Sequence, residues 1–91
     1  MRKLNALVID GDASSGLMVQ RLLEQAGFTV VLTRMGHEGL ALAKQSRFNL
    51  VCCDDNQTDI SGSEFSSKAR AIPGYDLIPL LCWRLKIICV H

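Results

Sequence analysis

Three aspartates follow two short apolar segments, and their spacing is the feature of this chain that could carry chemistry. Asp54 comes directly after the apolar run 50–53, and Asp10 and Asp12 come just after the apolar run 6–9. If both runs are neighbouring parallel strands, the three carboxylates lie at the same end of one sheet. Carboxylates this close repel one another unless a proton or a cation intervenes, and Mg²⁺ suits such a site because it takes oxygen ligands.

This arrangement predicts a Mg²⁺ site formed by Asp10, Asp12 and Asp54, with the backbone carbonyl of Asn56 as a further oxygen ligand. A bound cation would offset the charge of an incoming phosphoryl group, so Asp54 is the candidate nucleophile. A structural interpretation stands beside this one. Asp12 is also a suitable N-cap for a following helix, and Asp-Gly and Asp-Asp-Asn are ordinary turn sequences. The two roles of Asp12 are compatible.

The elements that must position these aspartates follow from the hydrophobic pattern. Strands are predicted at residues 4–9, 29–33, 50–53 and 77–83, and helices at residues 12–26, 36–45 and 62–71. Their alternation indicates an α/β fold, a three-layer, doubly wound parallel sheet of about four strands with three helices. The strand order 2-1-3-4, which is common in small doubly wound domains, makes the strands before Asp10 and Asp54 neighbours.

Each predicted helix has an apolar face at helical spacing. The members are Val19, Leu22, Leu23 and Ala26 in the first helix, Gly36, Gly39, Leu40 and Ala43 in the second, and Phe65, Ala69 and Ile72 in the third. Gly27 follows the first helix, where a left-handed residue is favoured. Pro79 is expected near the start of its strand or at a sheet edge, because it has no amide hydrogen for a ladder.

The composition limits the classes of function. The chain has 91 residues, enough for one domain, and 48% of them are hydrophobic, which suffices for a packed core. The net charge of +1 is spread out, which argues against a nucleic-acid-binding surface. No signal peptide is present and no apolar run approaches the roughly 20 residues of a membrane span, so we expect a cytoplasmic protein.

Two other reactive residue types are expected to be structural. All four cysteines lie in apolar runs, and Cys52 and Cys53 are adjacent, so they face opposite sides of a strand. Core packing is therefore favoured over a disulfide or a metal site. His37 falls early in a predicted helix, where we expect it to be exposed and without partners.

From about residue 4 to residue 83 the chain resembles the receiver domain of two-component response regulators. The matching segments are Leu-Val-Ile-Asp (7–10), Leu-Leu-Glu-Gln-Ala-Gly-Phe-Thr-Val (22–30), Gly-His-Glu-Gly-Leu (36–40), Asn-Leu-Val-Cys-Cys-Asp (49–54), Asp-Ile-Ser-Gly (59–62) and Ile-Pro-Leu-Leu (78–81). The resemblance implies a flavodoxin-like fold and a place in phosphorelay signal transduction, without enzyme activity in the usual sense. It also implies that Asp54 accepts a phosphoryl group from a histidine kinase or a histidine phosphotransfer protein, and that Asp10 helps to hold Mg²⁺.

The chain departs from the family pattern at positions that matter for this chemistry. Gly11 replaces the second of two adjacent acids, which weakens the expected Mg²⁺ site, and Thr58 replaces a common proline. Arg84 stands where the family has a hydroxyl residue at the end of the fourth strand. The family's fourth helix, its fifth strand with an essential lysine and its fifth helix do not fit into residues 85–91, and Lys86 is too near the fourth strand to take that lysine's role.

We therefore divide the chain into a receiver-like domain, residues 1–83, and a divergent tail, residues 84–91. The tail would extend the fourth strand, form a short extra strand or stay unpacked. A receiver cut short, with an unrelated tail, is favoured over a natural degenerate receiver. Loss of the last helix and strand would leave the edge of the fourth strand and one face of the sheet uncovered, which predicts a homodimer, a partner chain or aggregation.

Three functions remain open at this point. The first is a phosphoacceptor receiver, and the second is a degenerate or truncated receiver that acts only as a protein interaction module without phosphorylation. The third is a metal-dependent hydrolase that uses Asp54 and Asp10. It is disfavoured because Asn56 stands where a general acid would be needed.

Overall fold

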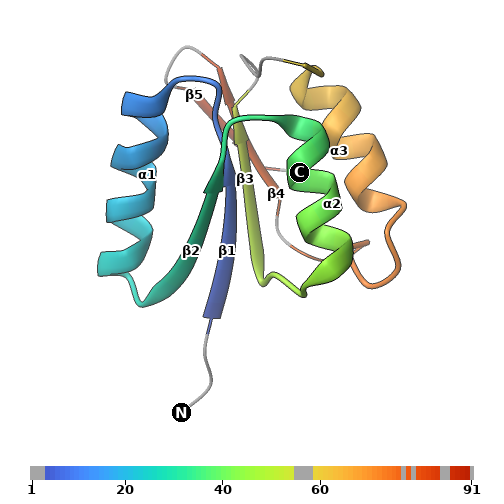
Figure 1. The fold of residues 1–91 in the computed structure, drawn as a ribbon, viewed down its shortest axis with the longest axis horizontal. Coiled ribbons are helices and arrows are strands. Elements are labelled where there is room, and N and C mark those ends of the chain that lie inside the picture. The colour runs from blue at the N-terminus through green and yellow to red at the C-terminus, as the bar shows by residue number, and fades with distance from the viewer. Residues whose placement is uncertain (1–3, 55–58, 77, 79, 85–86, 91) are drawn as a thin grey trace.

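The chain folds into one sheet with helices on both faces. The computed structural model describes residues 4–54, 59–76, 78, 80–84 and 87–90. Its elements are β1 (Leu4–Ile9), α1 (Ala13–Gln25), β2 (Phe28–Thr33), α2 (Gly36–Gln45), β3 (Leu50–Asp54), α3 (Gly62–Arg70), β4 (Leu80–Arg84) and β5 (Ile87–Val90). Helix α1 covers one face of the sheet, and α2 and α3 cover the other (Figure 1). No helix in these ranges is long and apolar enough to cross a membrane.

The strand order confirms the predicted fold class. The sheet has the order β2-β1-β3-β4-β5. Strands β2, β1, β3 and β4 are parallel, so the expected 2-1-3-4 arrangement with three helices is present. Residues 87–90 form a short strand antiparallel to β4, which is one of the alternatives left open by the sequence.

The fourth strand begins later than predicted. It starts at Leu80 and runs through Arg84, whereas the sequence pattern placed it at residues 77–83. Leu77 and Pro79 lie outside the described residues, so the expected position of Pro79 stays a prediction. The division of the chain into residues 1–83 and 84–91 also stays a prediction, although β5 belongs to the same sheet as β4.

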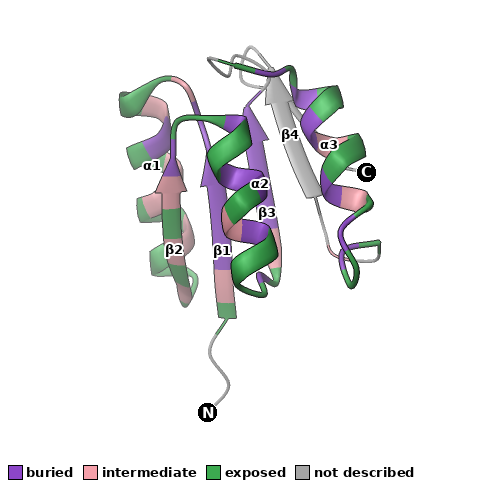
Figure 2. Cartoon of the chain, turned by 45° about the vertical axis from the view of Figure 1, so that its right-hand side comes forward, coloured by how far each residue is buried: buried purple, intermediate pink, exposed green. Residues whose placement is uncertain are grey.

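The main core lies between the sheet and helices α2 and α3 (Figure 2). Alternate residues of the central strands point into it, namely Leu7, Ile9, Val51 and Cys53. The predicted apolar faces of α2 and α3 are confirmed, because every residue assigned to them is buried. Cys52 and Cys53 are both buried, as expected for packing residues.

Helix α2 approaches the sheet closely because it carries a glycine there. A Cβ atom at Gly39 would lie 2.7 Å from Cγ1 of Ile9 and 3.3 Å from Cε2 of Phe65. Both distances are shorter than ordinary van der Waals contact. The absence of a side chain at Gly39 therefore allows α2 to pack directly over the end of β1.

The predicted apolar face of α1 is confirmed only in part, because Val19 and Leu23 are half-buried whereas Leu22 and Ala26 are exposed. Within α1 only Gly16 is buried, and Leu22 is 59% exposed. Leu17 and Met18 are also exposed. In the described part of the chain α1 is the only helix on its face of the sheet (Figure 1), so no second helix covers its apolar side. The helical spacing predicts an apolar face on α1. It does not predict whether another element of the fold packs against that face.

Candidate functional site

Two of the predicted carboxylates meet at the carboxyl end of the sheet. The register of β1 and β3 pairs Ile9 with Cys53, so the next residues, Asp10 and Asp54, lie side by side. Asp10 is fully buried and Asp54 is only 7% exposed. The structure thus brings together the two acids whose proximity the strand pattern predicted.

The backbone around β1 fixes one oxygen of Asp10 and leaves the other free. Its Oδ1 accepts a hydrogen bond from the amide of Asp12 at 2.9 Å, and its own amide donates to the carbonyl of Thr33 at 3.0 Å. Its Oδ2 is buried and has no hydrogen-bond partner among the described residues. A buried carboxylate oxygen without a partner is costly, so this position calls for a proton or a cation.

The electrostatics of Asp10 support the same conclusion. Burial, assisted by the neighbouring Asp54, raises the pKa of Asp10 to about 6 against the opposing hydrogen bond from the Asp12 amide. At neutral pH the buried carboxylate of Asp10 therefore carries an unfavourable negative charge beside Asp54. The oxygen donors, their charge and the unsatisfied Oδ2 fit a divalent cation such as Mg²⁺.

Asp12 takes the capping role. It is the N-cap of α1, and its two side-chain oxygens accept from the Ser14 amide at 3.1 Å and from the Ser15 hydroxyl at 3.0 Å. Within the described ranges no group of three or more Asp, Glu, His or Cys side chains is placed to hold a metal ion. The structure therefore does not gather the three aspartates into one metal-binding group, and a metal-ligand role for Asp12 stays a prediction.

The turn between β1 and α1 is held by its surroundings. Arg34 donates from Nη2 to the carbonyl of Gly11 at 3.1 Å. A Cβ atom at Gly16 would lie 2.9 Å from Leu32 and 3.3 Å from the Cβ of Asp10, so the start of α1 is packed against the acidic site. These contacts fix the position of the turn between β1 and α1, but they contribute no further carboxylate to the acidic site.

Asp59 has a role that was not predicted from the sequence. Its carboxylate accepts from the amides of Gly36 at 2.7 Å and His37 at 2.9 Å, and it lies 2.8 Å from Nδ1 of His37. Burial acts to raise the pKa of Asp59, but these hydrogen bonds outweigh it and lower the pKa to about 2. The segment after β3 is thereby tied to the start of α2.

This contact also corrects one expectation. His37 is exposed as predicted, but the expectation that it has no partner is wrong, because it pairs with Asp59. The need for a capping partner at the start of α2 could have been recognised from the sequence. Met35 is the N-cap of α2 and its side chain makes no capping hydrogen bond, so the free amides of the first turn need an acceptor from elsewhere.

Several residues weighed from the sequence are outside the described part. Asn56, Thr58 and Lys86 are among them, so the predicted backbone ligand and the two departures from the family pattern are untested. Arg84 is described only through its backbone, as the last residue of β4.

Comparisons with known proteins bear on both fold and site. No protein-family model matches the chain. The transcriptional regulatory protein ZraR of Salmonella typhimurium is 33% identical over 70 residues, which cover 77% of this chain but only 16% of ZraR. The chain therefore spans less than a fifth of that relative's length.

Solved structures match over most of the chain. The chemotaxis response regulator CheY4 of Vibrio cholerae has a TM-score of 0.84 and 31% identity, over 89% of this chain and 68% of its own. The receiver domain of the sensor histidine kinase PA1611 from Pseudomonas aeruginosa, solved with magnesium coordinated in its active-site cleft, has a TM-score of 0.82. It shares 16% identity, over 89% of this chain and 66% of its own, so it supports the fold alone.

Proposed function

We propose that this chain, which belongs to the receiver-domain family of response regulators, accepts a phosphoryl group on Asp54 in two-component signal transduction. One observation carries the proposal. Asp54 lies at the carboxyl end of β3 beside Asp10, whose buried Oδ2 has no hydrogen-bond partner among the described residues. The pair offers a nucleophilic carboxylate and a place for the cation that phosphoryl transfer to it requires.

The reaction at Asp54 is a transfer between two proteins. A carboxylate oxygen of Asp54 attacks the phosphorus of a phosphohistidine, an O–P bond forms, and the P–N bond breaks with its electron pair returning to the imidazole. The acyl phosphate adds negative charge beside Asp10. Mg²⁺, when bound, would neutralise that charge. Asp10 and Asp54 are the residues placed to hold it, with Asp12 and the carbonyl of Asn56 as further predicted ligands.

Family membership supports a proposal for the partner and for the location. We propose a histidine kinase or a histidine phosphotransfer protein as the phosphoryl donor, and the cytoplasm as the compartment. The chain then acts as an acceptor and messenger, not as an enzyme that turns over a substrate.

Incubation with acetyl phosphate and Mg²⁺ tests the proposal through intact mass. The wild-type chain should gain one phosphoryl group, and Asp54→Asn should gain none. The variant Asp76→Asn is the matched control, because Asp76 is exposed and precedes β4, at the opposite end of the sheet. It should still form the adduct. An adduct of equal yield on Asp54→Asn, or none on the wild type at any Mg²⁺ concentration, would overturn the proposal.

A second candidate function rests on the exposed apolar side of α1. Leu17, Met18 and Leu22 are 45%, 59% and 59% exposed, and they line a shallow cavity on one surface. Such a patch is typical of protein contacts. The alternative is thus an interaction module that works without phosphorylation, including a homodimer through the sheet edge at β5.

Light scattering coupled to size exclusion separates this candidate from the first. A chain that forms no acyl phosphate but elutes as a dimer supports the interaction module. A dimer through α1 should dissociate in the variant Met18→Glu with Leu22→Glu, whereas a dimer through the edge of β5 should persist. A molar mass of one chain at all concentrations would contradict the homodimer.

A further inference from the structure

A continuous groove runs between α2, α3 and the turn that follows α3. It consists of two adjoining cavities of about 620 and 470 Å³. Both are lined by Lys44, Ile72 and Pro73, so they form a single depression, here named the α2–α3 groove. The groove lies on the face of the sheet opposite α1.

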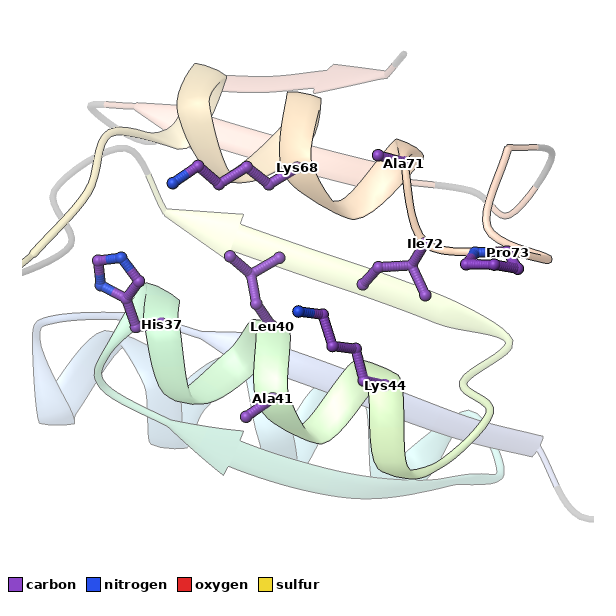
Figure 3. A pocket seen from close by; sticks show the side chains of 8 residues that line it. All are labelled: His37, Leu40, Ala41, Lys44, Lys68, Ala71, Ile72 and Pro73. Carbon is purple, nitrogen blue, oxygen red and sulfur yellow. The ribbon is translucent and has the colours of Figure 1, made fainter.

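The groove has an apolar floor and walls. Leu40 and Ile72 form its floor and are buried, while Ala41, Ala71 and Pro73 line its sides and are exposed. Figure 3 shows Leu40 on α2 and Ile72 after α3 facing the space between the two helices. An exposed apolar depression of this kind binds apolar side chains of a partner.

The rim of the groove is basic. Lys44, Lys68 and Arg47 line it, and among the residues that the structure describes no acidic one lines either cavity. In Figure 3 the side chains of Lys44 from α2 and Lys68 from α3 extend into the space between the helices. The charges are spread along the groove, which suits a ligand with several separated negative charges better than one small anion.

These cations are available to a partner. In the described part of the chain Lys44 makes no ion pair, and Lys68 makes one with Glu64 at 3.2 Å. Both side chains of that pair are about half exposed, so the pair contributes little and competes weakly with a partner. Arg47 lies over the ring of Tyr75, 5.9 Å from its centre, which holds a positive charge at one end of the groove.

We infer that the α2–α3 groove binds an acidic amphipathic helix of a partner protein. Its apolar side chains would enter between Leu40 and Ile72, and its carboxylates would meet Lys44, Lys68 and Arg47. Helix α2 has 10 residues and is about 15 Å long, so about three turns of a partner helix match the groove. This binding mode is a helix-in-groove contact, and it does not depend on phosphorylation of Asp54.

A designed peptide tests the inference without knowledge of the natural partner. The probe is a fluorescent helical peptide of about four turns built from Leu, Ala and Glu, with leucine at every third or fourth position. Fluorescence anisotropy should show saturable binding to the wild-type chain. Lys44→Glu combined with Lys68→Glu should weaken binding at least tenfold, while Arg21→Glu on α1 should leave it unchanged.

Two further measurements make the result decisive. Amide chemical-shift changes on binding should fall on α2 and α3 and not on α1, and the same peptide with Lys in place of Glu should not bind. If circular dichroism shows that the double variant is unfolded, Lys44→Gln replaces it and should weaken binding about threefold. No binding by the wild type, an equal loss in Arg21→Glu, or shifts confined to α1 would overturn the inference.

Discussion

Replacement of Asp10 by asparagine should stabilise the protein, because the buried charge of Asp10 costs the fold stability. The asparagine side chain would keep an oxygen acceptor for the Asp12 amide and remove the charge next to Asp54. The pKa of Asp10 is raised from 3.8 to about 6 in the fold. Since one pKa unit corresponds to about 1.4 kcal/mol, the ionised form costs the native state roughly 3 kcal/mol above pH 6.

The sign of the pH dependence follows from proton binding. Between pH 4 and pH 6 the native state holds the Asp10 proton while the unfolded state has lost it, so the stability falls as the pH rises. Below pH 4 both states are protonated and the cost vanishes. Asp10→Asn should therefore equal the wild type at about pH 4 and exceed it by up to about 3 kcal/mol at pH 7.5.

Urea unfolding followed by circular dichroism at these two pH values, in Mg²⁺-free buffer, measures the difference. Asp12→Asn is the control and should show no such gain at pH 7.5, because Asp12 is exposed and asparagine preserves its cap. The reasoning is refuted if Asp10→Asn is no more stable than the wild type at pH 7.5. It is also refuted if the difference is the same at both pH values.

Three further changes test other parts of the structure. Gly39→Ala should lose about 1 kcal/mol in urea unfolding, because overpacking of a new Cβ against Ile9 and Phe65 outweighs the gain in helix propensity; a gain in stability would contradict the close packing. Asp59→Ala should cost about 1 kcal/mol by uncapping α2. The stability that Asp59 provides should be present above pH 4 and be lost as the pH falls towards 2, and equal acid titrations of variant and wild type would rule this out. Gly11→Asp should lower the Kd for Mg²⁺ in calorimetric titration, because it supplies a second acid after β1; an unchanged Kd would show that this position does not face the cation.

The part of the site that rests on strand order was predictable from the sequence. Buried parallel strands are continuous apolar runs, so the segments before Asp10 and Asp54 could be recognised and paired by the usual doubly wound order. The close contact of α2 was visible in the same way, since Gly36, Gly39 and Ala43 mark a narrow helical face. Each of these segments can be recognised from residues close together in the chain, and the usual doubly wound order then pairs the two strands.

The other features of the fold and the site could not be predicted, because they depend on contacts between residues that no local sequence pattern indicates. Asp59 caps a helix that begins 23 residues earlier, and only the fold brings them together. The choice of Asp12 between helix cap and metal ligand depends on the direction of its side chain, which the spacing leaves open. The exposure of Leu22 depends on what else covers α1, which the helical period of that helix does not record.

Chemical identification of the residue that carries the phosphoryl group tests most directly the claim that Asp54 is the phosphoacceptor. After treatment with acetyl phosphate and Mg²⁺, borohydride reduces an aspartyl phosphate to homoserine, and peptide mass mapping then identifies the residue. We predict homoserine at position 54 and nowhere else, with the yield falling when Mg²⁺ is removed. Unmodified Asp54 in a chain that carries phosphate on another residue would contradict the assignment.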